Sequence, residues 1–219
     1  MEGDEVELLQ LGLTEKVLRT VGLDGCNPGL TPAKESPLTT DLDGEPFNED
    51  WEHASVVGML MCLVNTRPDM QFAVHQCGKY SHNPRASHAK AVKKICRYLQ
   101  GTKSRGIRFK KKLLDPMDMR LNVFVDASFC PNWKDEDDKN SSKSRTGYFM
   151  QLDDCPVQFV SKGQTETALS TTESEHIALS MAMRDLMWIR RLVNDMLIGF
   201  GIDHNKNTVM HSRFFIALL

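Results

Sequence analysis

The chain has 219 residues, of which 41% are hydrophobic and 26% are charged, and a formal net charge of −2. This length can hold one domain with a sizeable core, or one domain and a smaller companion, and the composition is ordinary for a globular protein. No apolar run approaches the roughly 20 residues of a membrane span, and the acidic start is unlike a secretory signal. We therefore expect an intracellular protein with no membrane partner. The sequence does not distinguish the cytoplasm from the nucleus.

The six cysteines never form a Cys-x-x-Cys pair, and several of them lie among apolar residues. This pattern favours reduced, mostly buried thiols over a disulfide framework or a zinc site.

The charges are strongly segregated along the chain. Residues 1–69 carry 14 acidic and 4 basic side chains, whereas the segment from Met70 to Leu114 has 12 Lys or Arg and no acid. A block of one sign can be a solvated helix face, but 12 bases without a compensating acid favour a surface that faces a polyanion.

The first half of the sequence predicts helices. Residues 8–21 form a short helical pattern that ends at Gly22, and a Pro- and Gly-rich connector follows to residue 50. Helical patterns return from His53, from Pro68, which suits a first helical position, and after Pro84 up to Gly101. The expected nucleic-acid-binding residues come from the last of these helices and the segment after it: Lys90, Lys93, Lys94, Arg97, Lys110, Lys111 and Lys112.

After residue 116 the apolar period changes from helical to alternating. Residues 121–125 alternate and lead into Asp126, which predicts a strand that ends on an acid. Two further strands are expected on either side of Asp153 and Asp154, whose chemistry is that of a turn.

The stretch from Gln164 to Met196 predicts a long amphipathic helix. Ser170 and Glu173 have the spacing of a capping box, so the helix should begin there. At about 100° per residue, Glu173 falls on the polar face, whereas Glu175 falls on the opposite face. Its neighbours there continue an apolar stripe: Ala178, Leu179, Ala182, Leu186, Ile189 and Val193.

Glu175 has two competing explanations. A glutamate in the first turn interacts favourably with the positive end of the helix dipole and can reach water sideways. Alternatively, the side chain points inward at a second carboxylate and a shared metal ion, because a carboxylate on a core-facing surface needs a partner.

Several motifs in order resemble the C-terminal part of the polyprotein of copia-type retrotransposons, where reverse transcriptase runs into a ribonuclease H domain. The similarity extends from about Leu8 to Arg213. It includes these segments: Thr66-Arg67-Pro68-Asp69, Gln100-Gly101-Thr102, Asp126-Ala127-Ser128, Ser144-Arg145-Thr146-Gly147-Tyr148, Gln158-Phe159-Val160-Ser161-Lys162 and Leu169-Ser170-Thr171-Thr172-Glu173-Ser174-Glu175.

The resemblance implies an α/β fold, in which a helical connection region precedes an incomplete ribonuclease H-like domain with a mixed sheet flanked by helices. It also implies that Asp126 and Glu175 are catalytic residues and ligands of Mg²⁺, or of Mn²⁺. Enzymes of this kind hydrolyse the RNA strand of an RNA–DNA hybrid with two divalent metal ions.

The sequence departs from the family pattern in two places. The third-strand segment and its helix are shortened or deleted before His211, which leaves Asp203 as a tentative third acid and no counterpart for the fourth. No Tyr-x-Asp-Asp segment is present, so no polymerase activity is expected. With ligands missing, we expect hydrolysis to be impaired or lost.

The resulting prediction has three regions: a thumb-like helix and irregular connector (1–52), a basic helical connection region (53–115) and a C-terminally incomplete ribonuclease H-like domain (118–219). The expected partners are an RNA–DNA hybrid or another nucleic acid, and the polymerase part of a retroelement polyprotein. Two alternatives to the nuclease stay open, a non-catalytic nucleic-acid-binding remnant and a decayed fragment of a reverse transcriptase.

Overall fold

The computed structural model describes residues 5–33, 36–110, 120–133, 138 and 141–201, together with the backbone of 211–216. The described residues fall into two units. One unit draws on Leu8–Ile107 and Asn132–Ser142, and the other draws on Met1–Glu7, Arg108–Pro131 and Lys143–Leu219. We call them the helical unit and the sheet unit and describe each by itself.

The helical unit forms because apolar residues recur at helical spacing in four segments, each with one buried side. Val92, Ile95, Cys96 and Leu99 of the last segment are all fully buried or nearly so, as the sequence predicts. The helices have these bounds: α1 Leu11–Thr20, α2 His53–Val64, a 3₁₀ turn Pro68–Met70 that leads into α3 Gln71–Gly78, and α4 Ala86–Gly101. β1, Glu5–Leu8, pairs with β2, Ile107–Lys110, in a separate two-stranded sheet, most of whose residues belong to the sheet unit.

The motif Thr66-Arg67-Pro68-Asp69 ties the 3₁₀ turn to the end of α4. The buried Arg67 guanidinium donates to both carboxylate oxygens of Asp69 at 3.0 and 2.8 Å and to the carbonyl oxygen of Thr102 at 2.9 Å. Burial alone would raise the pKa of Asp69, but hydrogen bonds from Arg67 and Tyr98 outweigh it and hold that pKa below its usual value. The motif from Thr66 to Asp69 and the motif Gln100-Gly101-Thr102 meet at these hydrogen bonds, so both have a structural role.

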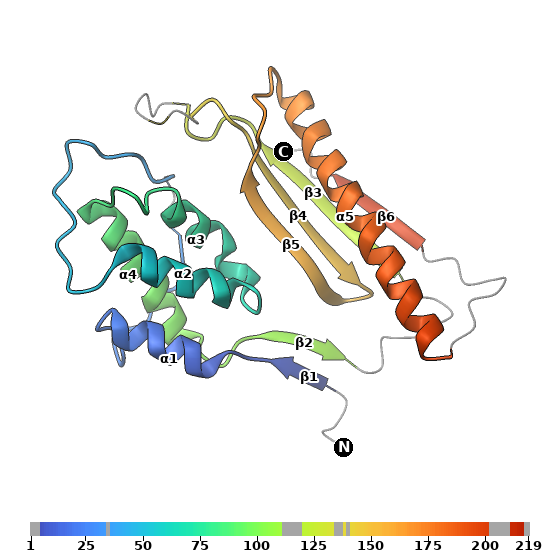
Figure 1. Ribbon diagram of the computed structural model, residues 1–219, viewed down its shortest axis with the longest axis horizontal. Helices are drawn as coiled ribbons and strands as arrows, with labels where there is room; N and C mark the ends of the chain where they lie inside the picture. Colours follow the sequence, from blue (N-terminus) through green and yellow to red (C-terminus); the bar gives the residue numbers. More distant parts are fainter. Residues whose placement is uncertain are drawn as a thin grey trace. The chain divides into compact units, whose positions relative to one another are not determined.

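The sheet unit is built on a four-stranded mixed sheet in the order β5-β4-β3-β6 (Figure 1). β4 pairs antiparallel with β5 on one side and antiparallel with β3 on the other. β3 in turn pairs parallel with β6. The turn between β4 and β5 holds Asp153, whose carboxylate accepts the N–H of Arg120 at 3.0 Å, so the turn assignment is confirmed. The strands have these bounds: β3 Arg120–Ser128, β4 Arg145–Leu152, β5 Cys155–Gly163 and β6 His211–Ile216.

One face of this sheet is covered by the long helix α5, Thr171–Gly199 (Figure 1). Leu121, Val123 and Val125 alternate along β3 and point at the helix, where they form one core with the buried stripe of α5. That stripe is Ala178, Ala182 and Leu186, as the helical spacing predicts. Two small alanines let the helix pack closely on the sheet.

The α/β fold class, a helical region followed by a mixed sheet, is confirmed. Two strands, β1 and β6, were not predicted; β6 follows soon after α5 in the chain and pairs with the strand that carries Asp126. The three-region domain division stays a prediction. Over the described residues, none of the helices combines the length and apolar character that crossing a bilayer requires.

Candidate carboxylate site

The first turn of α5 orients the two glutamates differently. Ser170 is the N-cap, and its hydroxyl oxygen accepts the N–H of Glu173 at 3.1 Å. Glu173 returns a contact by accepting the N–H of Leu169 at 2.7 Å, so its exposed carboxylate serves the cap. Because Glu175 lies two residues further on, it emerges on another side of the helix, towards the sheet.

Glu175 contacts the strand that carries Asp126. The N–H of Ala127 donates to Oε1 of Glu175 at 3.2 Å. The described β6 ladder ends at the pair Val125 and Ile216, so the carboxylate binds a strand N–H just beyond it. The second oxygen, Oε2, is buried and has no hydrogen-bond partner within the described structure. One carboxylate oxygen of the partly buried Glu175 is therefore bonded to β3 and the other is shielded from water, which favours the inward-pointing explanation; a role in metal binding stays a prediction.

The electrostatics of the site disfavour the ionised form of Glu175. Burial raises the pKa of its carboxyl, the hydrogen bond from Ala127 lowers it, and the negative charge of Asp126 raises it again, with a net increase. Asp126 is thus close enough to act on Glu175 through its charge. That the two acids form one site, as the family resemblance implies, stays a prediction.

The donor set is suited to a hard divalent cation. Mg²⁺ prefers oxygen ligands, and it is commonly held by one or two carboxylates together with waters and substrate phosphates. The unpartnered oxygen of Glu175 and the neighbouring charge of Asp126 supply such a pair. No group of three His, Cys, Asp or Glu suited to a metal occurs among the residues that the structure describes, and Asp203 lies outside them.

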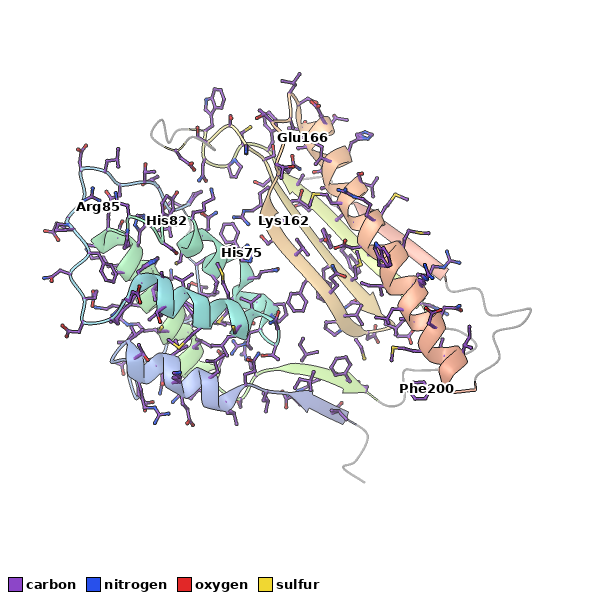
Figure 2. The ribbon with its side chains drawn as sticks, viewed as in Figure 1. His75, His82, Arg85, Lys162, Glu166 and Phe200 are labelled. Atoms are coloured by element: carbon purple, nitrogen blue, oxygen red, sulfur yellow. The ribbon has the colours of Figure 1, made fainter. Side chains whose placement is uncertain are left out.

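Two side-chain ties between α5 and the sheet were missed by the sequence analysis. Asp185 accepts hydrogen bonds from the hydroxyl of Tyr148 and, at 2.6 Å, from the amide of Gln158. Nearer the carboxylate site, the buried Gln164 donates to Thr146 Oγ1 at 3.1 Å and to the carbonyl oxygen of Ser174 at 2.8 Å. Figure 2 labels Lys162, near the end of β5, and Glu166, in the segment before α5; Gln164 lies between these two residues in the chain.

The predicted basic residues on α4, which lie in the helical unit, separate into two groups. Lys90, Lys94 and Arg97 of α4 line a groove of about 710 Å³ together with residues 26–29. Among the described residues, none of these three cations forms an ion pair with an acid. Lys93, in contrast, donates to Glu49 at 2.7 Å.

The remaining basic residues of the prediction lie at and after β2. Lys110 is exposed at the end of this strand, and Lys111 and Lys112 lie outside the described residues.

The groove has walls that are fixed by close backbone packing. The N–H of Gly29 donates to the carbonyl oxygen of Arg97 at 2.9 Å, and Pro28 lies so near Gly101 that a Cβ there would come within 2.7 Å of it. Gly101, which belongs to the motif Gln100-Gly101-Thr102, is therefore required by the close approach of Pro28.

Comparison with known proteins gives the family. The chain is 30% identical to the retrovirus-related Pol polyprotein from transposon RE2 of Arabidopsis thaliana, over 91% of this chain and 13% of that protein. It is also 30% identical to the Pol polyprotein from transposon TNT 1-94 of Nicotiana tabacum, over 91% of this chain and 16% of that protein. A third relative, secreted RxLR effector protein 161 of Plasmopara viticola, is 34% identical over 63% of this chain and 90% of its own length.

No family model matches the chain, and no solved structure matches it. The polyprotein relatives show that the chain belongs to the copia-type retrotransposon Pol polyproteins. It spans between 11% and 16% of the length of the transposon polyproteins that match it at about 30% identity.

The raised pKa of Glu175 predicts how replacing it changes stability. Because its folded-state pKa lies above the ordinary value, ionised Glu175 reduces stability as pH rises through that pKa. In metal-free protein at pH 7, Glu175→Gln should raise the thermal unfolding midpoint by roughly 1–3 °C, because the amide oxygen still accepts from Ala127. At a Mg²⁺ concentration a hundredfold above Kd, the free energy of unfolding of the wild type should rise by about 2.7 kcal/mol. That of the variant should not rise.

Glu173→Gln is the matched control, since Glu173 lies in the same turn but is exposed. It should respond to Mg²⁺ as the wild type does. An equal Mg²⁺ response in Glu175→Gln and the wild type would contradict metal binding by Glu175.

Proposed function

We propose that this retroelement-derived chain is a ribonuclease H-like domain that hydrolyses the RNA strand of RNA–DNA hybrids through a divalent metal ion held by Asp126 and Glu175. The observation that carries the proposal is the buried, unpartnered Oε2 of Glu175 beside the charge of Asp126. A carboxylate oxygen in that state costs free energy, and a bound cation would offset the cost.

In this proposal each residue has a defined task. Asp126 and Glu175 would hold Mg²⁺ or Mn²⁺, and the N–H of Ala127 fixes the orientation of the Glu175 carboxylate by binding Oε1, so that Oε2 is left for the cation. The bound cation would supply activation of a water and stabilisation of the leaving oxygen. With two protein carboxylates, more of the coordination falls to water and substrate phosphates, so hydrolysis should be slow.

The activity is tested with purified protein and an end-labelled RNA–DNA hybrid. With Mg²⁺ or Mn²⁺, the wild type should cleave the RNA strand slowly and leave the DNA strand intact. Asp126→Asn and Glu175→Gln should each lower the rate at least about 100-fold, because each removes a ligand charge.

Glu173→Gln again supplies a control, because it removes an acid from the same turn without touching β3. It should retain cleavage close to that of the wild type. Absence of metal-dependent cleavage by the wild type, or equal loss in all three variants, would refute the nuclease proposal.

A second function, binding of nucleic acid without catalysis, is favoured by the groove on α4. The spacing of Lys90, Lys94 and Arg97 aligns them along one side of the helix, where phosphates of a duplex could contact them in succession. Since these cations are not neutralised by acids in the described structure, they keep their charge for a polyanion. This function does not require the carboxylate site.

The groove predicts a difference between neighbouring lysines. Lys94→Gln and Arg97→Gln should each weaken hybrid binding and reduce the slope of log K against log salt by about 1, because each removes one phosphate contact. Lys93→Gln, the matched control, should leave the slope unchanged because Glu49 already neutralises this lysine. The measurement is fluorescence anisotropy with a labelled hybrid at several salt concentrations. Equal slopes for the Lys93 and Lys94 variants would contradict a specific role for the groove.

A further inference from the structure

We infer that Gln164 is a positioning residue for the carboxylate site, and that its side-chain amide places Glu175 on the N–H of Ala127. The inference rests on the proposed function for its catalytic consequence. Its geometric part concerns the protein alone and is tested without metal ion or nucleic acid.

Gln164 joins the two elements that meet at the site. Its Nε2 donates to the carbonyl oxygen of Ser174, which immediately precedes Glu175 in α5. The same nitrogen donates to Oγ1 of Thr146, which pairs directly with Ala127 across the β3–β4 ladder. One amide therefore contacts the neighbour of each partner in the Glu175–Ala127 hydrogen bond.

The position of Gln164 is itself fixed. Its backbone N–H donates to the carbonyl oxygen of Ser144 at 2.8 Å, and its side chain is only 2% exposed. The carbonyl of Ser174 can only accept, so the NH₂ end of the amide must face it. Because the buried amide nitrogen bonds to both Ser174 and Thr146, it restrains the first turn of α5 against β4 at the level of Ala127.

A general role in docking α5 would make a different prediction. Gln158 also ties α5 to the sheet, at Asp185, ten residues beyond Glu175. If any loosening of the helix disturbed the carboxylate, losing the Gln158 tie would act as strongly as losing the Gln164 tie. A positioning role requires that the carboxylate respond to Gln164 and not to Gln158.

The test compares Gln164→Met with Gln158→Met, because methionine keeps the unbranched length and removes the donor. Two quantities are measured by NMR in metal-free protein. They are the hydrogen-exchange rate of the Ala127 amide and the pKa of the Glu175 carboxyl group, followed by the chemical shift of its carboxyl carbon. In Gln164→Met the exchange rate should rise roughly 5- to 10-fold, the equivalent of one lost hydrogen bond, and the Glu175 pKa should rise further, because the hydrogen bond from Ala127 lowers it. Gln158→Met should leave both quantities unchanged.

Thr146→Val provides a second variant that keeps the bond to Ser174 and removes one acceptor. It should shift both quantities in the same direction by a smaller amount, and it keeps the test decisive if Gln164→Met does not fold. Unchanged exchange and pKa in the variants of Gln164 and Thr146, or equal changes in Gln158→Met, would overturn the inference. Neither quantity depends on cleavage, so an inactive wild type would refute the nuclease proposal and leave this inference standing.

Discussion

The hydrogen bond from the N–H of Ala127 to the carboxylate of Glu175 is the contact on which the site depends. It joins β3, just beyond its described pairing with β6, to the first turn of α5, across 48 residues of sequence. It also leaves one carboxylate oxygen buried without a partner, next to the charge of Asp126. A sheet and helix selected for stability alone would favour an apolar residue at position 175, since an unpaired buried carboxylate is costly.

The surrounding structure offsets that cost and holds the geometry. Packing of β3 and β4 against Ala178, Ala182 and Leu186 fixes α5 on the sheet, and the Ser170 cap fixes where the helix begins. Gln164 then connects the helix start to β4 within this frame. The apolar core thus sets the position of the helix, and a small number of buried polar contacts set the direction of the carboxylate.

The parts of this arrangement that follow from local sequence could be predicted. The capping box at Ser170 and the stripe from Ala178 to Leu186 are periodic signals, and they place Glu175 on the sheet side without any structure. The strand that carries Asp126 is likewise a local signal; it runs two residues further than the acid, to Ser128. Its meeting with Glu175 was expected from the family resemblance, because no spacing in the sequence shows that the two are neighbours.

The parts that depend on distant pairings could not be predicted. Glu49, which neutralises Lys93, lies 44 residues away in the sequence. The number of charges alone therefore predicted the same nucleic-acid-binding role for Lys93 and Lys94. The bonds of Gln164 need the hairpin and the helix in place before its amide has any partner. β6 pairs in parallel with β3, which lies about 90 residues earlier in the chain, so its partner could not be found from its own six residues.

The central claim is that Asp126 and Glu175 hold one divalent cation between them. The most direct measurement is a titration of the intact chain with Mn²⁺, followed by paramagnetic broadening of the backbone amide signals. We expect the earliest and strongest broadening at Asp126, Ala127 and Glu175, and removal of the effect by excess Mg²⁺. Broadening centred on other acids, such as Asp153 and Asp154, with the Ala127 signal unaffected, would contradict the account.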